Sequence, residues 1–171
     1  MVKWYEQGVC PNNKWEIFNG SKLQLIVRGP RKMRIAEFIW NKISQPRHRF
    51  IIWLAVQGRL LTKDRLRRMT ISMDNTSCSL CDAQIVETQK HLFSNCVWTR
   101  GIITEMSQWS GMLIPTGDVK QVLEKIKREN WKQLKKEITA ALWASVVYHV
   151  WQARNWKLYR GAKMTIGTTV T

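Results

Sequence analysis

Three cysteines and one histidine lie close together in the middle of the chain, at a spacing that suits metal binding. Cys78 and Cys81 are separated by two residues, so that a tight turn directs both sulfur atoms at one ion, and His91 and Cys96 follow in the next segment. A Cys₃His set is typical of structural zinc, with four protein ligands and no open position for water or substrate. These residues therefore predict a Zn²⁺ ion that holds a loop in shape and performs no reaction.

Two other uses of these cysteines fit the sequence less well. A redox Cys-x-x-Cys usually follows a strand and opens a helix in a βαβ pattern, whereas Cys78 follows the polar turn M-D-N-T-S. A disulfide framework requires an oxidising compartment, and the first residues, M-V-K-W-Y-E-Q-G, show no apolar signal segment. We therefore expect an intracellular protein with reduced thiols, in which Cys10 is an ordinary thiol, and we favour the nucleus over the cytoplasm.

The spacing of the last two ligands constrains the backbone that carries them. On a continuous α-helix, residues five apart project about 140° from each other, so His91 and Cys96 could not reach one metal. We therefore expect a short turn at H-L-F, a break near Ser94 and Asn95 that uses the left-handed conformation of asparagine, and a new helix from about Val97.

Helical periodicity of apolar residues predicts the elements around this motif. We expect helices over residues 34–45, 47–57, 63–69, 97–109 and 118–128, and one long or two abutting helices over 131–159. The third should begin at Thr62 through its side-chain oxygen, and Asp118 with Gln121 resembles a capping box. Most of the tryptophans within these patterns are expected in the core. The six in question are Trp40, Trp53, Trp98, Trp109, Trp143 and Trp151.

These elements indicate a mainly α protein with an embedded Cys₃His loop. We expect an N-terminal arm over 1–33, a helical zinc-binding domain over 34–110, a C-terminal helical segment over 118–160 and a tail over 161–171. The run after Asn19-Gly20 could add a short β-hairpin near the N-terminus. The most apolar stretch, 138–151, has 14 residues, whereas a bilayer needs about 20, so no membrane partner is expected.

The charge of the chain is large and unevenly distributed. The net charge is +16, divided into +11 over residues 1–72, −2 over 73–115 and +7 over 116–171. Such an excess favours a polyanionic partner, of which nucleic acid is the commonest. The candidate phosphate-binding residues are Arg47, Arg49, Arg59, Lys63, Arg65, Arg67 and Arg68. Phe93 and Trp98 are candidates for stacking on bases.

The order of these motifs resembles one known family. Three segments together are similar to the reverse-transcriptase zinc-binding domain. They are F-I-W-N-K-I-S-Q-P-R-H-R-F-I-I-W-L-A-V-Q-G-R-L-L-T-K-D-R-L, then C-S-L-C, then E-T-Q-K-H-L-F-S-N-C-V-W. That domain lies at the C-terminal end of plant LINE-type, non-LTR retrotransposon polyproteins. The later V-Y-H-V-W-Q-A-R-N resembles a helix downstream in the family, and the similarity spans residues 38–155.

The resemblance implies a nucleic-acid-handling accessory to a reverse transcriptase, with Cys78, Cys81, His91 and Cys96 as zinc ligands. Glu87 matches the acidic residue before the histidine, for which helix N-terminal electrostatics or an acceptor for the imidazole N–H are the two expected roles. The chain has no Y-x-D-D motif and no clustered carboxylates for a two-metal site, so we expect no enzyme and no small-molecule substrate.

Three functions therefore stay open at this point. The first is a non-catalytic zinc module that binds RNA or DNA through basic helices, with a reverse transcriptase supplied in trans as a further partner. The second is a zinc-stabilised protein–protein interaction module. The third is a retroelement remnant without present function.

Overall fold

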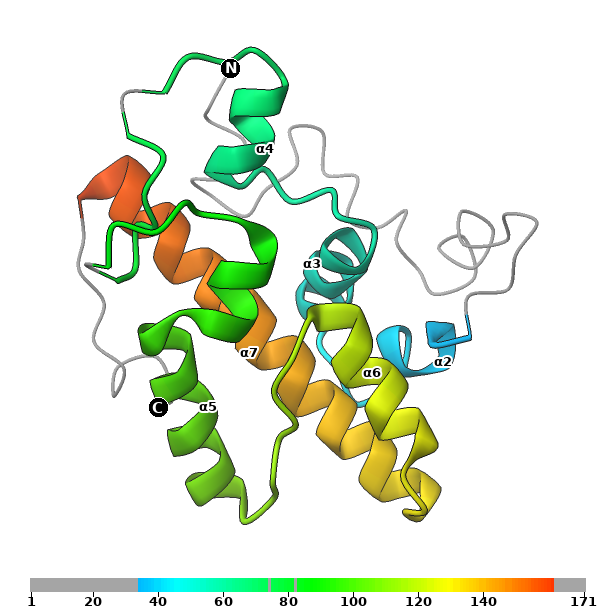
Figure 1. Cartoon of the computed structure of the whole chain (residues 1–171). Coiled ribbons are helices and arrows are strands. Elements are labelled where there is room, and N and C mark those ends of the chain that lie inside the picture. The colour runs from blue at the N-terminus through cyan, green and yellow to red at the C-terminus, as the bar shows by residue number, and fades with distance from the viewer. Residues whose placement is uncertain (1–33, 74, 82, 162–171) are drawn as a thin grey trace. The chain divides into compact units, whose positions relative to one another are not determined.

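The computed structural model describes residues 34–73, 75–81 and 83–161, and within them the protein is built from helices (Figure 1). In chain order these are α2 (Ala36–Ile39), α3 (Pro46–Val56), α4 (Lys63–Arg68), the π-helical turn η2 (His91–Asn95), α5 (Val97–Ser110), α6 (Val119–Arg128) and α7 (Gln133–Arg160). The prediction of a mainly α protein is confirmed. The expected β-hairpin, Cys10 and the tail beyond residue 161 lie outside the described residues.

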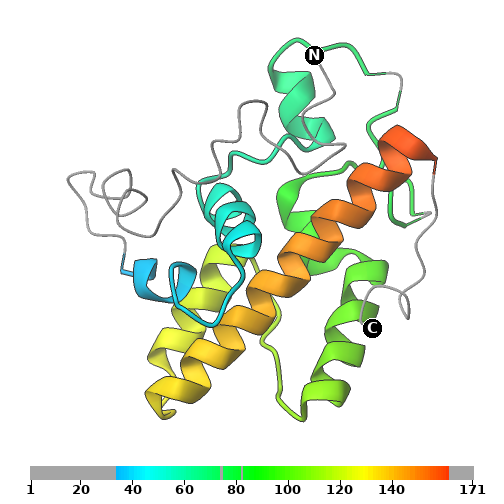
Figure 2. The same cartoon turned by 180° about the vertical axis from the view of Figure 1, so that it is seen from behind.

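The 28-residue helix α7 is the element on which the others pack. It contacts α3, α5, α6 and η2, and it runs diagonally through the unit formed by residues 37–171 (Figures 1 and 2). Trp143, Val147 and Val150 lie fully buried on its inner side, at the spacings of three, four and seven residues that align side chains on one helix face. Among the described residues, no helix is long and apolar enough to cross a membrane.

The first predicted helix is much shorter than expected. The prediction of a helix over 34–45 is wrong beyond Ile39, where α2 ends. The side chain of Asn41 donates to the carbonyl oxygen of Phe38 at 2.6 Å and accepts the backbone N–H of Ser44 at 2.9 Å. Because a short amide side chain competes with the helical hydrogen bonds in this way, it turns the chain toward α3.

Two predicted helix caps are also wrong in their chemistry, although both helices begin where expected. Thr62 and Asp118 occupy the N-cap positions of α4 and α6, but neither side chain makes a capping hydrogen bond. At the start of α4 the carboxylate of Glu87, from another segment, accepts a backbone N–H instead. The predicted end of the helix over 47–57 is confirmed, because α3 ends at Val56 and Gly58, just beyond it, has a φ of +63°.

The six tryptophans expected in the core do not share one environment. Trp53, Trp143 and Trp151 are buried, while Trp40 and Trp98 are half-buried. Trp109 is 74% exposed at the end of α5, so it is not one of the core tryptophans. It lies in the last turn of α5, after Met106, the last buried residue of that helix.

Histidines form part of the contact between α3 and α7. The ring of His48 is buried and lies 4.6 Å from the ring of Tyr148 and 5.5 Å from that of His149, measured between centroids. Burial, followed by the nearby charges of His149 and Arg47, lowers the pKa of His48 to about 4. The imidazole is therefore neutral in the folded protein over most of the physiological range.

This burial predicts a loss of stability in mild acid. Between pH 6.5 and about 4 the unfolded chain takes up a proton at His48 and the folded chain does not, so the free energy of unfolding falls as the pH falls. This loss of stability is absent above pH 6.5, grows as the pH falls and reaches about 3 kcal/mol below pH 4. Denaturant unfolding at several pH values should show a shallower dependence for His48→Phe than for the unmodified chain. Parallel curves for the two proteins would contradict the assignment.

Candidate zinc centre

The first two ligands lie on a small antiparallel loop. Ser77 pairs with Val86 in a β-bridge, the backbone N–H of Cys78 donates to the carbonyl of Ile85 at 2.8 Å, and that of Glu87 donates to the carbonyl of Thr76 at 2.9 Å. These bonds join the two arms of the loop. The Cys78-x-x-Cys81 turn follows directly, and the loop thereby presents both sulfur atoms on one side.

The other two ligands are brought together by one turn of π-helix. In η2 the backbone N–H of Cys96 donates to the carbonyl of His91 at 2.8 Å, which is the i→i+5 pattern of a π turn. This wider turn stacks residue 96 close to residue 91, as an α-helix would not. Cys96 then has extended backbone angles, φ −65° and ψ 128°, and α5 starts at Val97. The predicted break is confirmed, but it uses a π turn and an extended cysteine and no left-handed asparagine.

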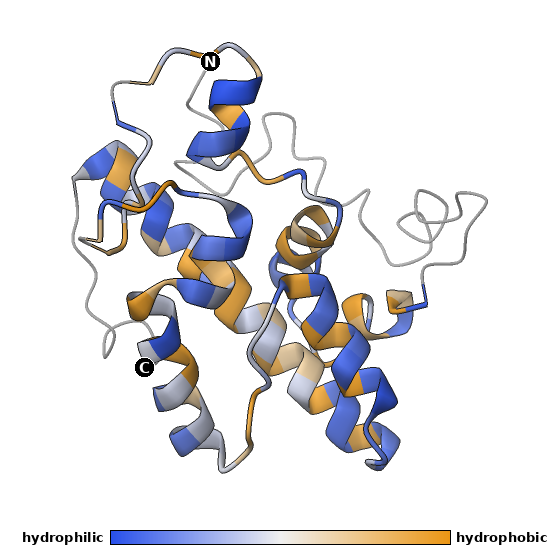
Figure 3. Cartoon of the chain, in the orientation of Figure 1, coloured by the Kyte–Doolittle hydropathy of each residue, from blue (hydrophilic) through white to orange (hydrophobic). Residues whose placement is uncertain are grey.

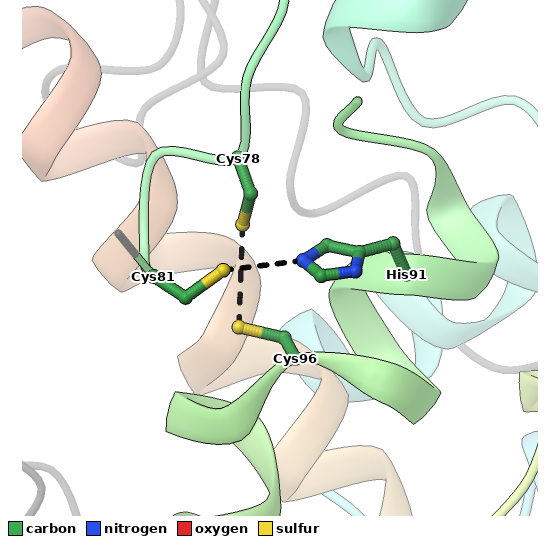
Figure 4. Close-up of side chains that lie close together, drawn as sticks. All are labelled: Cys78, Cys81, His91 and Cys96. Carbon is green, nitrogen blue, oxygen red and sulfur yellow. Dashed lines mark hydrogen bonds between the residues drawn. The ribbon is translucent and has the colours of Figure 1, made fainter. Parts of the chain in front are cut away.

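The four predicted ligands meet at one point (Figure 4). Their sulfur and nitrogen atoms all lie within 4.8 Å of one another. The sulfur atoms of Cys78 and Cys96 are 4.0 Å apart, and the sulfur of Cys81 is 3.3 Å from Nε2 of His91. Ligand atoms around a tetrahedral zinc, with Zn–S near 2.3 Å, are separated by roughly 3.7 Å. The donor set therefore fits a zinc ion, which these four residues would hold as a structural cross-link.

The electrostatics of the cluster favour the ligand form of Cys96 and of His91. The pKa of Cys96 is lowered by the hydrogen bond with Cys78, and the backbone N–H groups of Thr99 and Trp98, at the start of α5, also lower it against the effect of burial. Burial lowers the pKa of His91, while the charge of Glu87 opposes this. The hydrogen bond with Cys96, followed by burial, raises the pKa of Cys78. A thiolate and a neutral imidazole are the forms that bind metal.

A buried carboxylate behind the loop joins it to α4. Glu87 is 0% exposed. Its Oε1 accepts the backbone N–H of Lys63 at 3.1 Å, and its Oε2 accepts that of Ser79 at 3.3 Å, between the two cysteines of the turn. The backbone N–H of Asp64 also donates to the carbonyl of Glu87 at 3.2 Å. The expected role at a helix N-terminus is therefore the one observed, since a negative charge stabilises the first turn of α4.

An arginine from α7 neutralises this carboxylate. Arg154 is 1% exposed, and it donates to Oε1 of Glu87 from Nη2 at 2.8 Å and from Nε at 3.0 Å. Its Nη2 also donates to the carbonyl of Leu61 at 3.2 Å, and its guanidinium lies 4.8 Å from the ring centre of Trp151. Sequence reasoning did not identify this pairing. The signal was an arginine on the apolar face of α7, seven residues after Val147.

The structure separates the seven basic candidates into exposed and engaged side chains. The exposed ones are Arg47, Arg59, Arg67 and Arg68. Lys63 is buried, and its Nζ donates to the carbonyl of Ser77 at 2.7 Å, so its ammonium holds the loop that carries Cys78 and Cys81. Arg49 donates from Nε to the carbonyl of Ser44 at 2.7 Å, and Arg65 donates to the carbonyl of Gly58. These three cations therefore have partners within the fold.

The two aromatic candidates for stacking differ in the same way. Phe93 is fully buried in η2, so its assignment to an exposed stacking site is wrong. The π turn directs His91 toward the ligand cluster and Phe93 into the interior. Trp98 is half-buried in the first turn of α5.

Comparison with protein families gives one match. The family model described as zinc-binding in reverse transcriptase matches residues 15–102. This range contains all four ligands, Glu87 and α4, and it ends within α5, before α6 and α7. No curated protein and no solved structure matches the chain.

Proposed function

Because the chain belongs to the family of zinc-binding domains of reverse transcriptases, we propose that it is a non-catalytic zinc module that binds nucleic acid through its basic helices. The observation that carries the proposal is the attachment of α4 to the ligand loop. Glu87 accepts the N–H of Lys63, and Lys63 in turn donates to Ser77. A metal at the cluster would therefore fix the position of the basic helix α4.

The ion that suits this site is zinc, and its role is structural. Thiolates are soft ligands and imidazole also suits zinc, whereas magnesium and calcium prefer oxygen ligands. All four positions of a tetrahedral ion would be taken by protein. Cys78, Cys81 and His91 would thus be occupied as ligands, which supports a module without catalysis.

The surface proposed for nucleic acid consists of the exposed arginines Arg47, Arg59, Arg67 and Arg68, and we call it the α3–α4 surface. Arg59 lies 5.9 Å from the ring centre of Trp53, and Arg68 forms an exposed ion pair of 2.9 Å with Asp64. Such exposed pairs are weak, so they leave the guanidinium groups available to phosphates. On this proposal the protein acts in the nucleus, beside a reverse transcriptase supplied in trans.

Salt titration of binding tests this function. We expect the affinity for a 24-nucleotide single strand, or for a 24-base-pair DNA hairpin stem, to fall steeply between low and moderate salt, because bound phosphates release counterions. Replacing Arg59, Arg67 and Arg68 together by Gln should lower the log–log salt slope by about 2–3, since each phosphate contact contributes roughly one. Fluorescence anisotropy at four salt concentrations measures both quantities.

A matched control removes charge elsewhere. Lys42 and Lys90 are exposed and lie outside the α3–α4 surface, so Lys42→Gln with Lys90→Gln should change the slope much less. Affinity that is independent of salt for both probes would reject nucleic-acid binding through this surface.

A protein–protein interaction module is the second candidate function. Exposed apolar side chains flank α4 and the ligand loop, namely Met69, Ile71, Ile85 and Val86. Neighbouring exposed apolar residues of this kind favour a protein partner. The arginine variant discriminates between the two functions, because a protein contact through these four residues would survive it.

A further inference from the structure

A second concentration of positive charge lies where α6 meets α7, outside the segment matched by the family. Both helices follow residue 102, the end of that match. Seven cations gather over residues 120–136, and we call them the α6–α7 corner: Lys120, Lys125, Lys127, Arg128, Lys132, Lys135 and Lys136.

The amphipathic pattern of α6 places its cations on the side away from its apolar face. Its buried residues are Val119, Val122, Leu123 and Ile126, which form one apolar face. The hydrophilic side of the helix is continuous with the turn into α7 (Figure 3). Lys125, Lys132 and Lys135 are all exposed.

The acidic residues nearby neutralise only part of this charge. Glu124 is shared by Lys120 at 3.9 Å and Arg128 at 3.7 Å, and Lys127 pairs with Glu37 at 2.8 Å. Within the described part of the chain, no carboxylate pairs with Lys125, Lys132 or Lys135.

The start of α7 concentrates the positive charge further. Lys132 is its N-cap residue, without a side-chain capping bond, and the first turn contains no acidic residue. Positive side chains at the positive end of a helix repel its dipole, so an anion bound nearby would relieve this repulsion. Trp131 is half-buried just before this N-cap, and the ammonium of Lys135 lies 4.7 Å from its ring centre. Cations beside an aromatic ring form the combination that binds a nucleic-acid strand.

The α4 part of the first basic surface, with Arg67 and Arg68, lies far from the corner along α7. Arg154 joins α7 to Glu87 at the start of α4, whereas the corner lies at Gln133, the beginning of α7. The 21 residues between these positions span about 30 Å at 1.5 Å per residue. Both views place α4 and the α6–α7 turn at opposite ends of the 37–171 unit (Figures 1 and 2).

We infer that the α6–α7 corner is a second contact surface for the nucleic acid bound by the α3–α4 surface, so that one molecule spans both. This inference rests on the proposed function, and it specifies in addition how long a nucleic acid must be to contact both surfaces. A span of 30 Å corresponds to about nine base pairs of duplex at 3.4 Å per step. Longer probes reach both surfaces, and a six-base-pair stem reaches only one.

The test compares a 24-base-pair with a six-base-pair DNA hairpin stem. Lys125→Gln/Lys132→Gln/Lys135→Gln should lower the salt slope on the long stem by about 2–3 and weaken its binding at 0.1 M salt on the order of tenfold. On the short stem the loss should be at most about twofold, because the α3–α4 surface still binds it. The Arg59/Arg67/Arg68 variant is the matched control for removal of three charges, and thermal melting verifies that both variants fold.

The outcomes separate the inference from the function on which it rests. If the lysine variant binds the long stem like the unmodified chain while the arginine variant is weakened, the inference is wrong and the corner is left to an acidic protein partner. Equal losses on the long and the short stem would also overturn it, because they would reflect net charge alone. Absence of salt-dependent binding by the unmodified chain would instead reject the proposed function.

Discussion

Removing the metal, or replacing Cys96 with Ser, is expected to cost the protein its cooperative unfolding transition. Structural zinc contributes about 10–16 kcal/mol in finger peptides at neutral pH, as much as the entire stability of an ordinary domain, which is about 5–15 kcal/mol. The ligands come from a loop and a π turn with little backbone pairing of their own. Thermal melting followed by circular dichroism, with and without a chelator, measures the effect.

The fourth cysteine of the chain provides the control. The four clustered donors already fill a tetrahedral site, and Cys10 lies 68 residues before Cys78 in the sequence, so Cys10→Ser should melt like the unmodified chain and bind one equivalent of zinc. Hydrogen exchange should show that metal loss first opens residues 76–96. A chelator that leaves melting, exchange and helicity unchanged would contradict a structural metal at this site.

Breaking the buried ion pair between Glu87 and Arg154 is expected to have the second-largest effect. Arg154→Met leaves the carboxylate without a counter-charge in the interior, which typically costs about 3–5 kcal/mol. The double variant Glu87→Gln/Arg154→Met should recover part of this loss, because no charge then remains buried. Denaturant unfolding at saturating zinc gives both values and the coupling energy between the two residues.

An exposed pair of the same length is the natural comparison. Lys127 and Glu37 also lie 2.8 Å apart, but both side chains are about half exposed. Glu37→Gln should therefore cost less than about 1 kcal/mol. Equal costs for Glu37→Gln and Arg154→Met would show that burial does not give the Glu87–Arg154 pair its importance.

The features that could be predicted from the sequence are those set by residues close together in the chain. The Cys-x-x-Cys turn and the five-residue spacing of His91 and Cys96 are local, and geometry alone required the break that η2 provides. Helices α3, α5 and α6 begin and end within one residue of their predicted limits, because apolar periodicity and Gly58 act over a few residues.

The features that sequence reasoning missed depend on partners distant in the chain. Glu87 and Arg154 are 67 residues apart, and no local pattern pairs them. Lys63 looked like one cation among several on α4 until its ammonium was seen bound to Ser77. Asn41 ends α2 through its own side chain, although its neighbours have good helical periodicity.

The pairing of Glu87 with Arg154 also has a consequence for the order in which the protein is made. Synthesis proceeds from the N-terminus, and domains usually fold as they emerge. Here every metal ligand is synthesised more than fifty residues before the guanidinium that neutralises the carboxylate behind them. A nascent chain that has bound its ion would thus hold the Glu87 carboxylate without a counter-charge until α7 emerges and docks.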